Sequence, residues 1–188
     1  MTVGEFDVVV VGAGFAGMYQ LHRLRAMGLS VQVLEAGDDV GGTWYWNRYP
    51  GARCDIPSME YSFSFSPELE QEWDWTEVMA GQPEILEYAQ HIADRFDLRR
   101  DIKFNTRVAS AHYREERRWR ITTETDDVFE SRFCVLATGC LSVPNTPKIE
   151  GADQFKGDIY HTGQWPHVGV DFSTTRVGII GTGSSCLL

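Results

Sequence analysis

The sequence predicts an α/β fold with a parallel sheet at its centre, and three observations support that prediction. Residues 6–11 form a short, nearly continuous apolar run, as expected of a strand buried on both faces. A helical pattern at residues 16–27 and a β-branched run at residues 31–34 follow it, completing a β-α-β unit of about 30 residues. Later, three strand-like runs separated by polar turns predict an antiparallel meander inserted into the α/β fold.

Each expected element has its own local signals. The first helix has an apolar stripe at helical spacing, formed by Met18, Leu21 and Leu24. Residues 83–96 predict a second long helix with a proline in its first turn, and residues 102–104 could return to the main sheet. The meander strands are expected at residues 107–113, 119–123 and 128–136, and one more strand at residues 176–180.

Composition excludes several classes of protein. The chain has 188 residues and a formal net charge of −10, which argues against a nucleic-acid partner because phosphate binding needs clustered Lys and Arg. No apolar run approaches the ~20 residues of a membrane helix, and the first residues lack the pattern of a signal peptide. The four cysteines form no C-x-x-C pair, so we expect reduced thiols in a cytoplasmic protein and no metal site.

A glycine motif follows the first strand. Gly12, Gly14 and Gly17 form G-x-G-x-x-G, with Phe15 and Ala16 between the last two glycines. A predicted helix begins at the motif, and an acidic residue, Glu35, follows about 20 residues later. This is the sequence context that dinucleotide binding requires. The Glu35 carboxylate would accept hydrogen bonds from a ribose diol and repel a 2′-phosphate. The first nucleotide is therefore predicted to be FAD or NAD, not NADP.

Two adjacent glycines, Gly41 and Gly42, form a glycine pair that is followed by Thr43 and by an aromatic stretch. Adjacent glycines permit close approach of a backbone to a ligand. A long flavin lying across the sheet would need that approach, so the pair favours FAD. The aromatic residues around it could be ordinary core residues, although we favour packing at the flavin edge: Trp44, Tyr45, Trp46, Tyr49 and Tyr61.

Two longer motifs carry a resemblance to a known family. Residues 41–61, with the run WYWNRYPGARCD at 44–55, resemble the Baeyer–Villiger monooxygenases, and among them most resemble the phenylacetone, steroid and cyclohexanone monooxygenases. Residues 155–166 fit the family pattern F-x-G-x-x-x-H-x-x-x-W-P at every position. The resemblance covers residues 6–185 or so, and it implies an N-terminal fragment that is incomplete and inactive alone. We expect His161 in the second motif to be a structural or hinge residue away from the flavin.

The resemblance implies an activity and a set of site residues. It implies an enzyme that uses FAD, NADPH and O₂ to convert ketones to esters or lactones through a C4a-peroxyflavin. The catalytic candidate is Asp55, whose family counterpart lies beside the flavin and positions an arginine that this sequence does not contain. The cofactor candidates, from the glycine motifs and the resemblance together, are Gly12, Gly14, Phe15, Ala16, Gly17, Glu35, Gly42, Thr43, Trp44, Tyr45, Trp46, Arg53, Cys54, Asp55, Tyr61, Val108, Gly181, Gly183, Ser184 and Ser185.

Three alternatives stay open. A flavin monooxygenase that oxidises nitrogen or sulfur would typically lack the tryptophan of the Trp165-Pro166 pair. A flavin disulfide reductase would need a cysteine pair of the C-x₄-C type after the glycine loop, and the sequence has no such pair. An inactive fragment that only binds FAD is the third alternative.

The expected fold class is therefore a Rossmann-like FAD-binding domain with an inserted antiparallel β-meander, plus the first strand of a truncated second, NADPH-binding Rossmann domain. The expected boundaries are residues 1–143 for the FAD domain, 144–175 for a linker that carries the second motif, and 176–188 for the start of the NADPH domain. Cys186 stands where that domain's third glycine is expected. A side chain there would crowd the helix against the strand, which puts NADPH binding at this loop in question.

Overall fold

The computed structural model describes residues 2–181 and 183. The chain divides into two compact units. The first unit consists of Met1–Tyr45 and Leu86–Gly139, and the second of Trp46–Ile85 and Cys140–Leu188.

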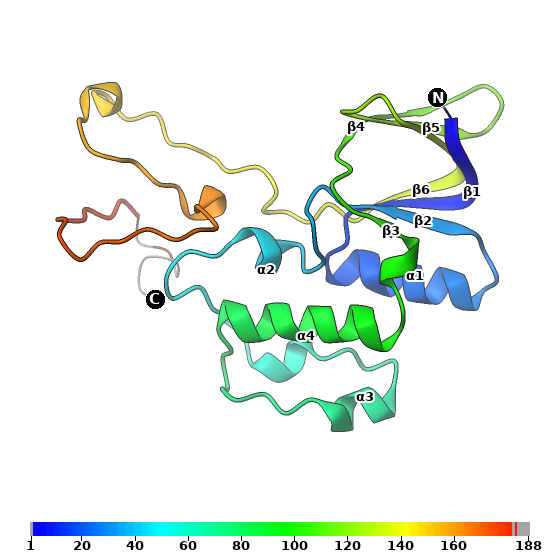
Figure 1. The fold of residues 1–188 in the computed structure, drawn as a ribbon, viewed down its shortest axis with the longest axis horizontal. Coiled ribbons are helices and arrows are strands. Elements are labelled where there is room, and N and C mark those ends of the chain that lie inside the picture. The colour runs from blue at the N-terminus through cyan, green and yellow to red at the C-terminus, as the bar shows by residue number, and fades with distance from the viewer. Residues whose placement is uncertain (1, 182, 184–188) are drawn as a thin grey trace. The chain divides into compact units, whose positions relative to one another are not determined.

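The first unit contains one six-stranded sheet in the order β3-β2-β1-β6-β5-β4 (Figure 1). The strands β1 (Thr2–Val11), β2 (Val31–Leu34), β3 (Ile102–Lys103) and β6 (Val128–Leu136) run parallel to one another. The strands β4 (Val108–Tyr113) and β5 (Trp119–Thr123) continue the sheet in antiparallel fashion from β6. The expected meander is therefore present, and its last strand is also a central strand of the parallel sheet.

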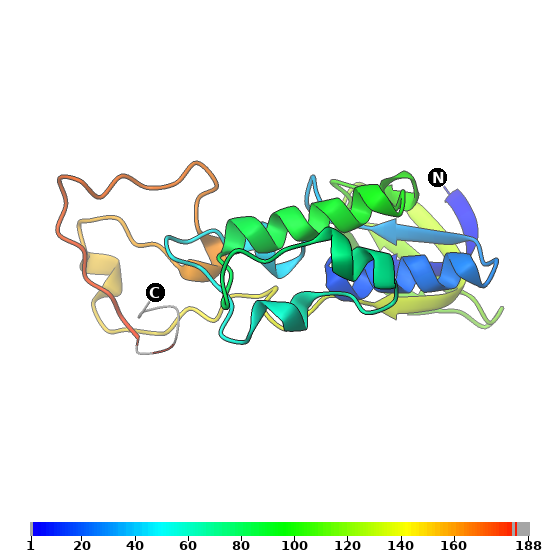
Figure 2. The ribbon, with the colours of Figure 1, turned by 90° about the horizontal axis from the view of Figure 1, so that it is seen from below.

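Successive side chains of β1 point to opposite faces of the sheet, and each face packs against different elements. Val8 and Val10 are fully buried, as are Met18 and Leu21 of α1 (Phe15–Ala26), which Figures 1 and 2 show lying along the sheet. On the other side, Val9 belongs to a buried cluster with Leu34, Ile121 and Phe129. The meander thus closes a small core against β1 and β2, because successive strand residues point to opposite faces.

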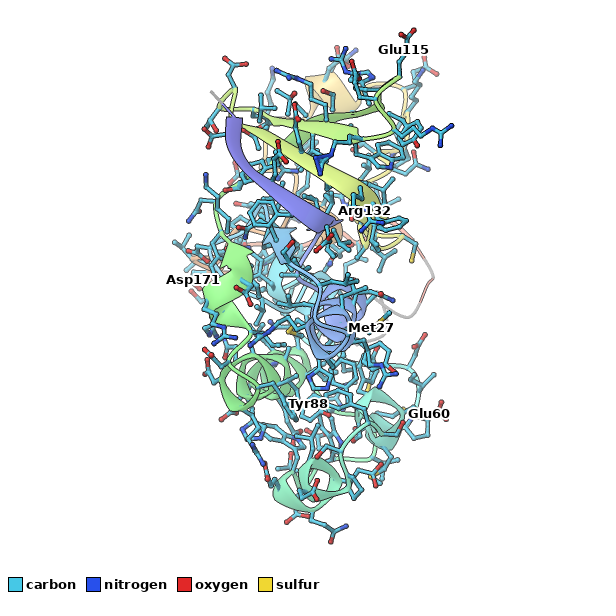
Figure 3. All side chains as sticks on the ribbon, turned by 90° about the vertical axis from the view of Figure 1, so that its right-hand side faces the viewer. Met27, Glu60, Tyr88, Glu115, Arg132 and Asp171 are labelled. Carbon is cyan, nitrogen blue, oxygen red and sulfur yellow. The ribbon has the colours of Figure 1, made fainter. Side chains whose placement is uncertain are left out.

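The long helix α4 spans Gln82–Arg95 and has one strongly apolar face. Its residues Ile85, Ala89 and Ile92 are buried, as the helical spacing predicts. Tyr88, labelled in Figure 3, is 1% exposed, and its ring stacks on Phe15 with centroids 6.2 Å apart. This contact brings α4 to the start of α1.

The short helices α2 (Thr43–Trp46) and α3 (Pro67–Glu72) were not predicted from the sequence. The 3-10 turns of the described residues were not predicted either: Ser58–Tyr61, Arg99–Asp101, Ala152–Gln154 and Thr162–Gln164. The expected strand at residues 176–180 is wrong, because the structure assigns no strand there. Val177, Ile179 and Ile180 are 56%, 71% and 77% exposed, and a strand forms only where a neighbour pairs with it. Among the described residues, none of the helices has the length and apolar character needed to cross a membrane.

Candidate functional site

The turn after β1 requires glycine at two positions. Gly12 has a φ of +103°, and a β-carbon there would lie 2.6 Å from the Ala137 carbonyl oxygen. A β-carbon on Gly17 would lie 1.9 Å from the Gly12 carbonyl oxygen. No side chain fits in either place, so the two glycines allow α1 to pack directly on the end of the sheet.

The first turn of α1 has the features of an anion site. Gly14 is the N-cap residue in extended conformation, no side chain caps the helix, and the first turn contains no acidic residue. The N–H groups of a helix's first turn have no carbonyl partner within the helix, and the helix dipole adds positive charge there. Ala16 in this turn is exposed. The turn can therefore receive a phosphate on its backbone.

The second glycine pair lies directly against this turn. A β-carbon on Gly42 would lie 2.8 Å from the Gly14 Cα atom, and Gly42 has a φ of +55°. The Gly41 N–H donates to the Ala13 carbonyl at 3.1 Å. The two glycine segments thus meet backbone to backbone, which a side chain at Gly42 would prevent.

Glu35 follows β2 and is 4% exposed. One carboxylate oxygen, Oε2, accepts from the Ala13 N–H at 2.6 Å, and the other, Oε1, accepts from the Gly37 N–H at 2.8 Å. Each oxygen retains a second lone pair that a ribose hydroxyl could use. Besides its predicted ribose role, Glu35 therefore fixes the glycine turn, which the sequence pattern alone did not indicate.

The aromatic residues after the glycine pair differ in placement. Trp44 and Tyr45 are 9% and 6% exposed, whereas Trp46 is 36% exposed. The Tyr45 hydroxyl donates to Asp38 Oδ1 at 2.7 Å, and its ring lies so close to Gly37 that a β-carbon there would be 2.7 Å away. Tyr45 therefore packs within its own loop. The exposed residues of this segment are Thr43 and Trp46.

The candidates Arg53, Cys54 and Asp55 lie in the second unit. Cys54 is 3% exposed and its N–H donates to the Ala80 carbonyl, while Arg53 pairs with Glu77 at 3.0 Å. Asp55 is exposed and, within the described residues, forms no pair with Arg53. The side chain of Asp55 thus projects from a backbone segment held in place at Cys54.

The other end of that segment is held by Ser58, which is 1% exposed. The Ser58 hydroxyl donates to the Glu77 carbonyl at 2.7 Å and accepts from the Ala80 N–H at 2.8 Å. The Ser58 N–H donates to the Val78 carbonyl at 2.7 Å. Residues 55–57 therefore form a short exposed loop with both ends fixed. Tyr61, in the turn that follows, is half-buried.

The motif at residues 155–166 has a structural arrangement within the second unit. His161 Nδ1 accepts a hydrogen bond from the Gly163 N–H at 3.0 Å, the structural role expected for it. The Trp165 ring lies 5.5 Å from Tyr160 and 5.9 Å from Phe172, measured between ring centroids. The tryptophan of the motif thus organises a small aromatic cluster.

The remaining candidates are dispersed. Val108 is half-buried and packs on the core cluster of the sheet. Gly181 and Gly183 are exposed, and Ser184, Ser185 and Cys186 lie outside the described residues, as does Thr182. The three cysteines in the described part, Cys54, Cys134 and Cys140, are free, and burial raises the pKa of the Cys134 thiol.

Comparison with known proteins gives a consistent set of relatives. Residues 9–187 match the family described as "Pyridine nucleotide-disulphide oxidoreductase". A Baeyer–Villiger monooxygenase of Pseudooceanicola batsensis is 50% identical over 98% of this chain and 34% of its own length. The phenazine N-monooxygenase PhzNO1 of Lysobacter antibioticus is 46% identical over 96% of this chain and 34% of its own length.

A solved structure shows the same fold. The structure of an oxidized steroid monooxygenase bound to NADP is 62% identical, with a TM-score of 0.89, and the match covers 97% of this chain and 35% of that one. The chain spans about a third of the length of the curated relatives it matches. The resemblance to Baeyer–Villiger monooxygenases is thereby confirmed, and the chain belongs to the pyridine nucleotide-disulphide oxidoreductase family.

Proposed function

We propose that this chain is the FAD-binding part of an NADPH- and O₂-dependent flavoprotein monooxygenase that converts ketones to esters or lactones. The observation that carries the proposal is the backbone contact between Gly14 and Gly42 at the first turn of α1. A contact this close leaves backbone rather than side chains beside the helix N-terminus, which suits a dinucleotide diphosphate. The 50% identical Baeyer–Villiger relative supports the reaction type.

The chain's own residues divide the binding task among them. The N–H groups of Ala16 and Gly17, in the first turn of α1, would bind the diphosphate. The free lone pairs of Glu35 would accept the ribose hydroxyls, and its charge would disfavour a 2′-phosphate. When bound, the flavin supplies the redox chemistry of the reaction. The protein contributes binding, orientation and exclusion of water.

Asp55 is proposed as the catalytic residue of this chain. It is exposed on a loop whose ends are fixed at Cys54 and Ser58, and among the described residues no ion pair involves its carboxylate. Such a carboxylate can orient a cationic side chain, in line with the role that the resemblance implies. NADP binding at Gly181 and Gly183 in the complete enzyme is proposed on the resemblance, despite the side chain of Cys186 at the expected third glycine. The steroid monooxygenase structure bound to NADP supports use of this cofactor, without assigning its place in this chain.

Oxidation of nitrogen is a second candidate function. The 46% identical phenazine N-monooxygenase shares nearly the whole of this chain with the Baeyer–Villiger relatives, so overall identity does not separate the two reactions. Trp165 of the second motif favours the ketone reaction, because the resemblance implies that N-oxidising flavin monooxygenases typically lack this tryptophan.

A single experiment with both substrates distinguishes the two functions. The complete enzyme that contains this chain, loaded with FAD, is supplied with NADPH, O₂, cyclohexanone and a phenazine, and the products are identified by mass. We expect lactone from the complete enzyme, much less of it from its Asp55→Asn variant, and neither product from this chain alone. N-oxide without lactone would replace the first proposal by the second, and neither product from the complete enzyme would refute both activities. FAD uptake, measured separately, tests the binding part alone.

A further inference from the structure

Asp39 joins the loop after β2 to two distant segments of the first unit. Its Oδ1 atom accepts from Arg99 Nη1 at 2.5 Å and from the Val40 N–H at 2.7 Å. Its Oδ2 atom accepts from Gln90 Nε2, on α4, at 2.7 Å. Arg99 lies in the 3-10 turn Arg99–Asp101, between α4 and β3. One carboxylate therefore ties the loop to α4 and to the turn that follows it.

Arg99 is itself fixed by a second acid. Its Nε donates to Asp94 Oδ1 at 2.6 Å, so the guanidinium bridges the last turns of α4 and the loop. The side chains of Arg99 and Asp39 are 35% and 24% exposed. Burial alone would raise the pKa of Asp39, but hydrogen bonds from Arg99, the Val40 N–H and Gln90 outweigh it and leave that pKa below its usual value. The carboxylate is thus charged and paired throughout the neutral range.

The loop that Asp39 anchors leads directly to the glycine pair. Val40 is fully buried, and the next residue, Gly41, donates its N–H to the Ala13 carbonyl. Gly42 then packs on Gly14. The position of the glycine pair is therefore determined from two sides, by the glycine turn and by the Asp39 network.

We propose that Arg99, through Asp39, is a positioning residue that holds Gly41 and Gly42 against the glycine turn and so pre-forms the cofactor site. This inference rests on the proposed function in its binding part only. Arg99 touches neither the glycine pair nor the first turn of α1 in any contact described for it, so it acts through the loop. Pre-forming a site improves affinity because less ordering is required when the ligand binds.

The test compares three variants of this chain. Arg99→Met keeps an unbranched, largely apolar stem and removes the charge and the hydrogen-bond donors, whereas Arg99→Lys keeps the charge. Arg100→Met is the matched control, because Arg100 lies on the same turn, is 60% exposed and pairs with Asp97 and Asp101 instead. Hydrogen exchange at the amides of Gly41 and Trp44 is measured without cofactor, and the FAD dissociation constant is measured by titration.

We expect Arg99→Met to speed exchange at Gly41 and to raise the FAD dissociation constant, each about tenfold, as befits the loss of a charge-assisted hydrogen bond at a partly exposed site. Arg99→Lys should recover most of both effects, and Arg100→Met should show neither. Unchanged exchange at Gly41, or acceleration at Val9 as large as that at Gly41, would overturn the inference. If the unmodified chain takes up no FAD, the proposed function fails, while the exchange comparison still decides the role of Arg99.

Discussion

Gly14 and Gly42, from separate turns of the first unit, approach so closely that a β-carbon on Gly42 would lie 2.8 Å from the Gly14 Cα atom. A Gly42→Ala substitution must therefore displace one of the two backbones. We expect the substitution to weaken FAD binding at least tenfold. It should also lower the free energy of unfolding by about 1–3 kcal/mol, because Gly42 has a positive φ that strains an alanine.

The control for that substitution is Gly151→Ala. Gly151 has a similarly positive φ of +77°, but a β-carbon there would meet nothing within 4 Å. The Gly151→Ala substitution should therefore introduce the same kind of backbone strain as Gly42→Ala but leave the FAD affinity unchanged. Equal FAD affinity in the two variants would contradict the importance of the Gly14–Gly42 contact.

Glu35→Ala should impair both binding and folding. We expect FAD affinity to fall by about 1–3 kcal/mol, since the ribose hydroxyls lose a charged partner. The free energy of unfolding should fall as well, because the N–H groups of Ala13 and Gly37 lose their acceptor. Glu116→Ala, at an exposed position, is the control. Titration calorimetry and urea unfolding measure the two effects, and an unchanged dissociation constant would remove Glu35 from the site.

His22 should make stability depend on pH. Burial lowers the pKa of His22 below its ordinary value of 6.5, and Arg23 and Arg25 lower it further. As the pH falls, His22 is therefore protonated in the unfolded chain before it is protonated in the folded one. The contribution of neutral His22 to the free energy of unfolding is complete above pH 6.5 and is lost as the pH falls through the folded pKa. Between pH 7 and pH 5, the free energy of unfolding measured in urea should fall less for His22→Gln than for the unmodified chain. The same loss in both would contradict this assignment.

The apolar residues near the C-terminal end should matter little for folding of the first unit. Ile180 is 77% exposed, whereas Ile121 is fully buried in the core cluster. Ile121→Ala should cost about 2–5 kcal/mol of unfolding free energy, and Ile180→Ala less than about 0.5 kcal/mol. A large cost at Ile180 would mean that this segment packs against other residues in solution.

Much of the first unit could be predicted from the sequence, because its signals are local. The β1-α1-β2 unit follows from apolar periodicity and the glycine turn, and the strands β5 and β6 begin and end at the expected residues. Helix α3 also had a local signal that we did not use, since Ser66 caps it and Pro67 begins it. The strand expected at residues 176–180 failed because β-branched residues supply propensity but no pairing neighbour.

The less predictable features depend on contacts between distant residues. The pairing of Asp39 with Arg99 joins segments on either side of α4, and no spacing rule connects them. The two backbone hydrogen bonds of Glu35 likewise appear only once the turn has folded, although Glu35 itself was found from its place after β2. The motif identified Glu35 as a candidate ligand residue, and the fold shows that it also supports the glycine turn.

The most direct test of the central claim is an absorbance spectrum of the purified chain after incubation with equimolar FAD and NAD, followed by gel filtration. If the glycine turn binds a flavin nucleotide, about one FAD per chain elutes with the protein, its flavin bands are perturbed, and NAD does not displace it. A colourless protein that retains NAD instead would contradict the assignment of the glycine turn to a flavin nucleotide.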